Sequence, residues 1–201
     1  RYSRYREDSD LSAINRVALR GGSIVVDDET GALLSYADTC HGQSDGLFDI
    51  TSGILRRAWS WKEPRLPEPT LLQELLSHVG WHRLEWRPPR LDFPQPGLEL
   101  DFGGIVKEYA ADRAAAMLTA AGVRHGLVNL GGDIRVVGPQ PDGAPWRIGV
   151  QHPQRPGHLL TTLSLSQGAL ASSGDYERCI VVDGVRYGHI LNPRTGWPVR
   201  V

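Results

Sequence analysis

Glycine occurs beside charged and hydroxyl residues in four parts of the chain, a combination that a plain core helix or strand would not need. Backbone without side chains lets a ligand approach closely, and free N–H groups at the start of a helix bind anions. A lysine and a histidine accompany these glycines and could add charge or move a proton. In segment 100–110 this combination fits a phosphate or pyrophosphate site. The segments are 44–51, 100–110, 128–134, and 172–177 with 189–196.

Segment 100–110 has the pattern of a strand, a Gly-Gly turn and the first turn of a helix. This arrangement leaves backbone N–H groups free for an anion, and Lys107 follows one turn into the helix. The segment lacks the GxxxxGK[ST] spacing of a P-loop, and the chain has no GxGxxG fingerprint. Taken alone, it is more typical of a turn that needs positive φ, with Lys107 solvated.

Two further features are structural when each is taken alone. The stretch from Asn129 to Asp133 ends an apolar strand with two glycines and an acid, which is typical of a bend or an Asx turn. His189 follows a hairpin strand and precedes a Pro-x-Thr-Gly turn, and a lone histidine is more often structural than catalytic. Neither feature by itself assigns a function.

The pattern GxSxG at 42–46 matches the nucleophile elbow of serine hydrolases. That elbow requires a strand before the serine and a helix after it. Here a helical pattern precedes Ser44 and a β-favouring run follows it, so we reject a hydrolase. The sequence also lacks HExxH and the paired-cysteine spacing of zinc sites.

Helices and strands that would position these segments can be predicted from periodicity. A helix is expected from Asp28, which would cap it, through Cys40. Thr70 and Gln73 have the spacing of a capping box for a second helix over 71–79. The other expected elements are an alanine-rich helix over 107–121, strands over 23–26, 98–102, 126–137, 146–150 and 159–165, and an Asp-Gly hairpin over 181–186.

The order of these elements indicates the fold class. Helices come first and antiparallel-looking strands later, which favours α+β with a mixed, largely antiparallel β-sheet core and flanking helices. No linker divides the chain, so we expect a single domain over 1–201. With 40% hydrophobic residues and a net charge of −1, the chain has no electrostatic signature of nucleic-acid or anionic-membrane binding. Cys40 and Cys179 are expected to be free thiols.

The order of the motifs carries more information than any one of them. The chain contains SDGLFDIT, LDFGGIVKEYAADRA, VNLGGDIR, WRIGV, ALASSGDYE and HILNPRTG, in that order. In this it resembles the ApbE family, the FAD:protein FMN transferases, whose fold is T-fold-like. The resemblance covers nearly the whole chain, from Ser3 to Gly196. It implies a magnesium-dependent enzyme that transfers FMN from FAD to a threonine or serine hydroxyl, forming a phosphoester and releasing AMP.

The resemblance also implies roles for particular residues. His189 would relay the proton of the acceptor hydroxyl, and Lys107 would add positive charge at the pyrophosphate. Gly104 would offer its backbone carbonyl to Mg²⁺. The implied FAD-binding residues are Tyr5, Leu47, Phe48, Asp49, Asp101, Lys107, His189 and Ile190.

The implied partner is an acceptor flavoprotein, such as a subunit of an Nqr- or Rnf-type redox complex. The implied location is the outer face of a bacterial cytoplasmic membrane, in the periplasm, with a lipid anchor on the full-length protein. Family members continue past the TGxP turn into an Asp- and Thr-bearing segment that completes the magnesium site, and they begin with a lead segment. We expect this chain to lack both and therefore to bind FAD but catalyse poorly.

Two substitutions depart from the family's pattern, and two other functions remain open. Asn192 stands where Asp is frequent and Glu108 where Gly is common, and both changes are expected to be tolerated. In the same fold, water in place of threonine would give a magnesium-dependent FAD pyrophosphatase. A non-catalytic flavin-binding or partner-docking module is the third possibility.

Overall fold

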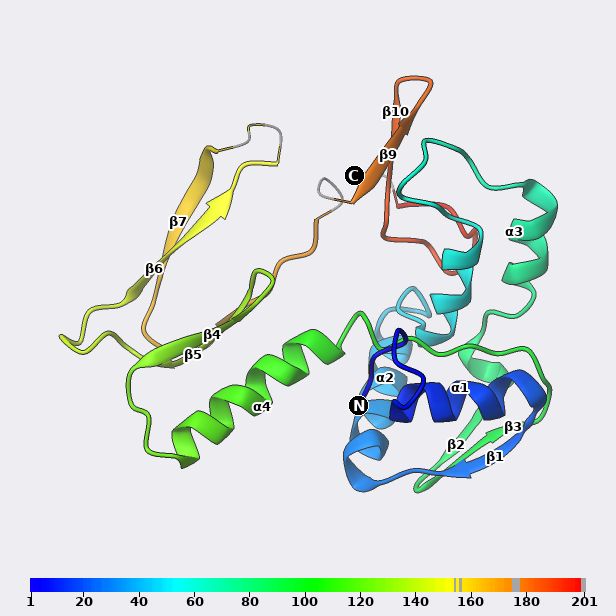
Figure 1. The fold of residues 1–201 in the computed structure, drawn as a ribbon, viewed down its shortest axis with the longest axis horizontal. Helices are drawn as coiled ribbons and strands as arrows, with labels where there is room; N and C mark the ends of the chain where they lie inside the picture. The colour runs from blue at the N-terminus through cyan, green and yellow to red at the C-terminus, as the bar shows by residue number, and fades with distance from the viewer. Residues whose placement is uncertain (154, 156, 175–177, 200–201) are drawn as a thin grey trace. The chain divides into compact units, whose positions relative to one another are not determined.

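The computed structural model describes residues 1–153, 155, 157–174 and 178–199 (Figure 1). The chain divides into two compact units. The first consists of Arg1–Gly104 and Arg178–Val201, and the second of Ile105–Glu177. Because the first unit takes in both ends of the chain, segments distant in sequence can meet within it.

Helix α1, Asp10–Arg20, opens the first unit and was not predicted. The side chain of Ser9 accepts a hydrogen bond from Ser12 N, which caps the helix. Leu11, Ile14 and Ala18 are buried at helical spacing. An N-cap serine before an apolar period is a helix signal, so the sequence contained the necessary information.

Helices α2, Asp28–Gln43, and α3, Pro69–Leu76, are confirmed, but both predicted caps are wrong. Asp27, not Asp28, caps α2 by accepting from Thr30 N. Helix α3 begins before Thr70 and has no side-chain cap, because proline fixes a helical φ and has no N–H to satisfy. Two short 3-10 helices, η1 and η2, complete the helical elements of this unit; they span Ile50–Arg57 and Trp81–Arg83.

Three strands of the first unit form an antiparallel sheet in the order β1-β3-β2. Leu91 and Phe93 of β3 are buried on one face. The charged residues of β3 occupy the alternate positions and so belong to the opposite face, because successive side chains of a strand point to opposite sides. Figure 1 shows α1 lying beside this sheet. The strands are β1 (Gly22–Val25), β2 (Glu85–Arg87) and β3 (Arg90–Phe93).

The strand expected at 98–102 does not form. The apolar residues Leu98, Leu100 and Phe102 are buried as the pattern predicts, although Glu99 between them is buried as well. The backbone of Leu100, however, pairs with a side chain: its N–H donates to Asn15 Oδ1 at 2.7 Å and its carbonyl accepts from Asn15 Nδ2 at 2.9 Å. A side-chain amide thus takes the place of a neighbouring strand.

A hairpin of the first unit joins β9, Cys179–Val182, to β10, Val185–Gly188. Asp183 and Gly184 both have positive φ, 50° and 76°, which confirms the predicted Asp-Gly turn.

The second unit combines one long helix with antiparallel strands. Helix α4, Val106–Ala120, packs against β4 and β5 and confirms the predicted alanine-rich helix. Strand order is β4-β5-β8, with β6 and β7 as a separate pair. All described pairings are antiparallel, as expected for the α+β class. The strands are β4 (Gly126–Leu130), β5 (Asp133–Gly138), β6 (Trp146–Gln151), β7 (Leu159–Leu165) and β8 (Ala169–Leu170).

Both cysteines are half-buried. Within the described ranges, no helix has the length and apolar character needed to cross a membrane.

Ser9→Ala should lower the free energy of unfolding by about 1 kcal/mol, because it removes the cap of α1. It also removes the 2.7 Å hydrogen bond from Ser9 Oγ to Ser3 O. Urea denaturation would measure the change. Thr39→Ala is the control, since it deletes an exposed hydroxyl in mid-helix. A shift no larger than that of the control would contradict the capping role of Ser9.

Candidate active site

Asp101 links the Gly-Gly turn of the first unit to the N-terminal segment. Its Oδ1 accepts from Gly103 N at 2.8 Å, and its Oδ2 forms an ion pair with Arg4. Arg4 also donates to the Tyr5 hydroxyl at 2.9 Å and lies over the Tyr5 ring. Tyr5 itself is 80% exposed. Two of the predicted site residues, Tyr5 and Asp101, are therefore brought together through Arg4, which sequence reasoning missed.

Arg4 is held in its charged form by these neighbours. Burial acts to lower the pKa of Arg4, but the hydrogen bond with Tyr5 and the charge of Asp101 outweigh burial. Its pKa consequently lies above the ordinary value for arginine. A permanent cation thus stands at the exposed tyrosine.

Phe48 lies against the backbone of Gly104. A Cβ added to Gly104 would be 2.9 Å from Phe48 Cε2, so only glycine allows this approach. The Phe48 N–H donates to Ser44 Oγ at 2.8 Å, which fixes the loop. Leu47, the neighbouring residue, is 53% exposed. The loop therefore presents one apolar side chain to solvent and one to the Gly-Gly turn.

Asp49 is buried, and its carboxylate is used within the protein. Oδ1 accepts from Thr51 N at 2.8 Å and from Thr51 Oγ1 at 2.7 Å. Oδ2 accepts from Trp81 N at 3.0 Å, and His41 Nε2 lies 3.7 Å away. These bonds attach the end of the 44–49 loop to η1 and η2. Direct contact of Asp49 with a ligand stays a prediction.

His189 has a defined orientation. Its Nδ1 lies 3.2 Å from the carbonyl oxygen of Arg178. Because a carbonyl only accepts, this bond requires Nδ1 to carry the hydrogen, so the other nitrogen, Nε2, has the lone pair. His189 and Ile190 are both half-buried, and Ile190 O accepts from Val199 N at 2.9 Å. The histidine can thus accept a proton at Nε2.

Two long-range contacts hold the 189–196 loop. Arg194 donates to the carbonyl oxygen of Asp45, which connects this loop to the 44–49 loop. Trp59 Nε1 donates to Gly196 O at 2.9 Å, from a residue 137 positions away. Neither Trp59 nor Arg194 was predicted, since nothing in their spacing marks them as partners. Trp59 is also surrounded by aromatic rings, those of Trp61, Tyr187 and Trp197.

Lys107 belongs to the second unit, where it forms an ion pair with Asp133. The distance from Lys107 Nζ to Asp133 Oδ2 is 2.7 Å, and Asp133 Oδ1 accepts from Ser172 N at 3.0 Å. Burial acts to raise the pKa of Asp133, but Lys107 and the Ser172 N–H outweigh it and hold that pKa below its ordinary range. The predicted Asx turn is confirmed by a 2.9 Å bond from Gly132 N to Asn129 Oδ1. Residues 175–177 of the predicted fourth segment lie outside the described residues.

Magnesium needs oxygen ligands, and the described residues supply few. Nowhere in the described ranges do three His, Cys, Asp or Glu side chains gather as a metal site would require. Gly104 is exposed and could offer its carbonyl, whereas Asp101 is already engaged by Arg4 and Gly103. One backbone oxygen fits a magnesium ion held mainly by ligand phosphates and water.

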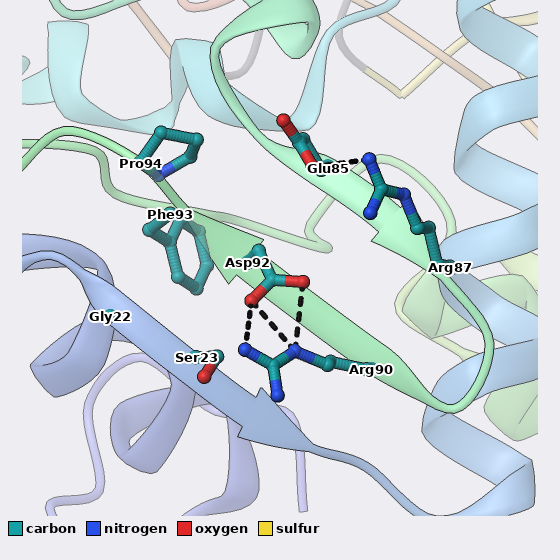
Figure 2. A pocket seen from close by; sticks show the side chains of 8 residues that line it. All are labelled: Gly22, Ser23, Glu85, Arg87, Arg90, Asp92, Phe93 and Pro94. Carbon is teal, nitrogen blue, oxygen red and sulfur yellow. Dashed lines mark hydrogen bonds and ion pairs between the residues drawn. The ribbon is translucent and has the colours of Figure 1, made fainter.

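An open hollow of about 580 Å³ lies elsewhere in the first unit, on the β1-β3-β2 sheet (Figure 2). Glu85 pairs with Arg87 at 2.7 Å, and Asp92 pairs with Arg90 at 2.8 Å. The charges around the hollow therefore neutralise one another. None of the predicted site residues lines it.

Solved structures identify the class of protein to which this fold belongs. The chain superimposes on the ApbE protein of Thermotoga maritima with a TM-score of 0.88 and 37% identity, over 99% of this chain and 65% of that one. The apo form of the Pseudomonas stutzeri flavinyl transferase ApbE gives a TM-score of 0.84 and 30% identity, over 99% of this chain and 63% of that one. The fold is that of the flavin transferases.

The sequence comparisons are more specific. The ApbE family model matches residues 1–201, and the chain belongs to the ApbE family. A FAD:protein FMN transferase of Klebsiella pneumoniae is 40% identical over 96% of this chain and 61% of its own length. One from Vibrio cholerae is 32% identical over 98% of this chain and 60% of its own length. The chain thus spans about three fifths of these relatives.

Gly53→Ala tests the packing behind Asp101. A Cβ at Gly53 would lie 2.4 Å from Asp101 Cβ, so the substitution should lower the free energy of unfolding by about 1–3 kcal/mol. Gly42→Ala is the matched control, because it lies in α2 with nothing within 4 Å. The control should leave stability unchanged or raise it by up to about 1 kcal/mol. Equal denaturation midpoints for the two variants would contradict the close packing of η1 against Asp101.

Proposed function

We propose that the protein containing this chain transfers FMN from FAD to a threonine or serine hydroxyl of an acceptor flavoprotein, releasing AMP. The observation that carries the proposal is the orientation of His189, whose Nε2 is available as a base while Nδ1 is bonded to Arg178 O. The loop that bears it is joined by Arg194 to the loop of Leu47 and Phe48. Its family membership and the names of its relatives support the same reaction.

The chemistry needs a base and neutralised phosphates. The acceptor oxygen attacks the FMN-side phosphorus, a new P–O bond forms, and the bond to the AMP phosphate breaks. We assign His189 Nε2 to accept the hydroxyl proton, a role worth about 10²–10⁴-fold in rate. Lys107 would contribute positive charge toward the pyrophosphate. Magnesium, with Gly104 O as one candidate protein ligand, would neutralise phosphate charge when bound.

Exposed aromatic and apolar groups would bind the rest of the dinucleotide. Tyr5 and Leu47 are both exposed, and Tyr5 is backed by the Arg4 guanidinium. A flat flavin ring gains from stacking on such surfaces. Asp101, which pairs with Arg4, would keep this surface in place. Asp49 would hold the 44–49 loop, and Ile190 would hold the 189–196 loop.

The acceptor and location proposed for the full-length protein follow from the family. We propose an acceptor subunit of the Nqr or Rnf type, and attachment to the outer face of a bacterial cytoplasmic membrane. Mass spectrometry of flavinylated proteins in cells with and without the gene would test the acceptor.

His189→Ala in the full-length protein should lower the rate of FMN transfer by about 10²–10⁴-fold and weaken FAD binding much less than that. Transfer would be measured by the mass gain of an acceptor protein and by AMP release. His158→Ala is the control, because His158 is exposed and is not among the residues assigned to the site. Full activity of the His189 variant would overturn the base assignment. If the unsubstituted protein released AMP without a mass gain of the acceptor, it would instead be a pyrophosphatase. If it bound FAD without releasing AMP, it would be a binding module.

A further inference from the structure

Asp133 is a charged residue placed almost entirely out of water. It is 2% exposed, although it directly follows a glycine turn at the start of β5. A buried carboxylate needs a cation or several N–H groups in return. In this unit it has one cation and one backbone N–H: Lys107 Nζ at 2.7 Å and Ser172 N at 3.0 Å.

The position of this carboxylate is set by the backbone before it. Gly131 and Gly132 have positive φ, 59° and 97°, which ordinary residues rarely adopt. Gly132 N also bonds to Asn129 Oδ1 at 2.9 Å, so the turn is closed on itself. Asp133 therefore enters β5 at one fixed place and direction.

The two members of the ion pair differ in exposure. The Asp133 side chain is 3% exposed, whereas that of Lys107 is 42% exposed. The acid thus lies inside the unit, whereas part of the lysine side chain is open to solvent. Lysine has a flexible stem, and an unpaired ammonium would occupy many positions. Contact with a fixed, buried acid removes most of that freedom, while the lysine side chain as a whole stays 42% exposed.

We propose that Asp133 is a positioning residue that holds the Lys107 ammonium in place to receive the phosphates of the dinucleotide. This inference rests on the proposed function, in which Lys107 contributes charge at the pyrophosphate. Asp133 itself would not touch the ligand. Removing it should weaken FAD binding only as long as Lys107 is present.

The test is a double-mutant cycle on FAD affinity in the full-length protein, followed by flavin fluorescence. Lys107→Met and Asp133→Asn should each weaken FAD binding about tenfold, the size expected for one charge-assisted contact. In the Lys107→Met background, Asp133→Asn should change the FAD affinity by less than about twofold, because the ammonium group that Asp133 positions is absent. Thermal unfolding of each variant would show that it is folded.

Asp112→Asn is the matched control. Asp112 pairs with Arg135 at 3.2 Å, and this pair also joins α4 to β5, but both side chains are exposed. The control should leave FAD affinity within about twofold, since exposed pairs contribute little. If Asp133→Asn does not fold, Asp133→Glu keeps the charge and moves it, and the same dependence on Lys107 is expected.

The possible failures are distinguishable. If the Asp133 variant weakened FAD binding equally with and without Lys107, Asp133 would act on its own and the inference would be wrong, although the function would stand. If FAD binding were unaffected by either single variant, the positioning role would also be wrong. If the unsubstituted protein bound no FAD, the proposed function would fall and this inference with it.

Discussion

A carboxylate removed from water must be given cations or N–H groups in exchange, and this constraint organises the loops of the chain. Asp49 accepts hydrogen bonds from the N–H groups of Thr51 and Trp81 and so joins two 3-10 helices. Asp101 collects Arg4 and the Gly103 N–H. Each acid lies in or at the end of a glycine-bearing segment, so the segment is held by its own carboxylate rather than by strand pairing.

The second unit uses the same solution. Asp133 follows a Gly-Gly turn, as Asp101 precedes one, and it too contacts one cation and one backbone N–H. Glu99, also buried, is neutralised by Arg56 and Arg57. Buried acids therefore serve mainly to fix backbone in this protein. Tyr5 and Leu47, by contrast, are exposed and available to a ligand, and Nε2 of the half-buried His189 is not used in the bond to Arg178 O.

Local patterns predicted most elements, and the errors have specific causes. The cap of α2 lies one residue before the expected Asp28, because two aspartates are adjacent and Asp27 is the one that accepts from Thr30 N. Segment 98–102 has a strand's alternation, yet Asn15 takes the hydrogen bonds that a strand would have made. An alternating apolar pattern in the sequence therefore does not by itself produce a strand in a sheet.

The sequence by itself determined the features that depend on neighbouring residues and on motif order. The Asp183-Gly184 hairpin, the Asn129 turn and the alanine-rich helix each follow from a few adjacent side chains. The order of the glycine-bearing motifs likewise sufficed to indicate the ApbE family.

Only the tertiary structure decided which groups face one another. Arg4 meets Asp101 across 97 positions, and Arg194 meets Asp45 across 149. The tautomer of His189 depends on a carbonyl eleven residues away, that of Arg178 just before β9. Such contacts are set by how whole elements pack, and packing energy is shared among many residues, so no local spacing in the sequence specifies them.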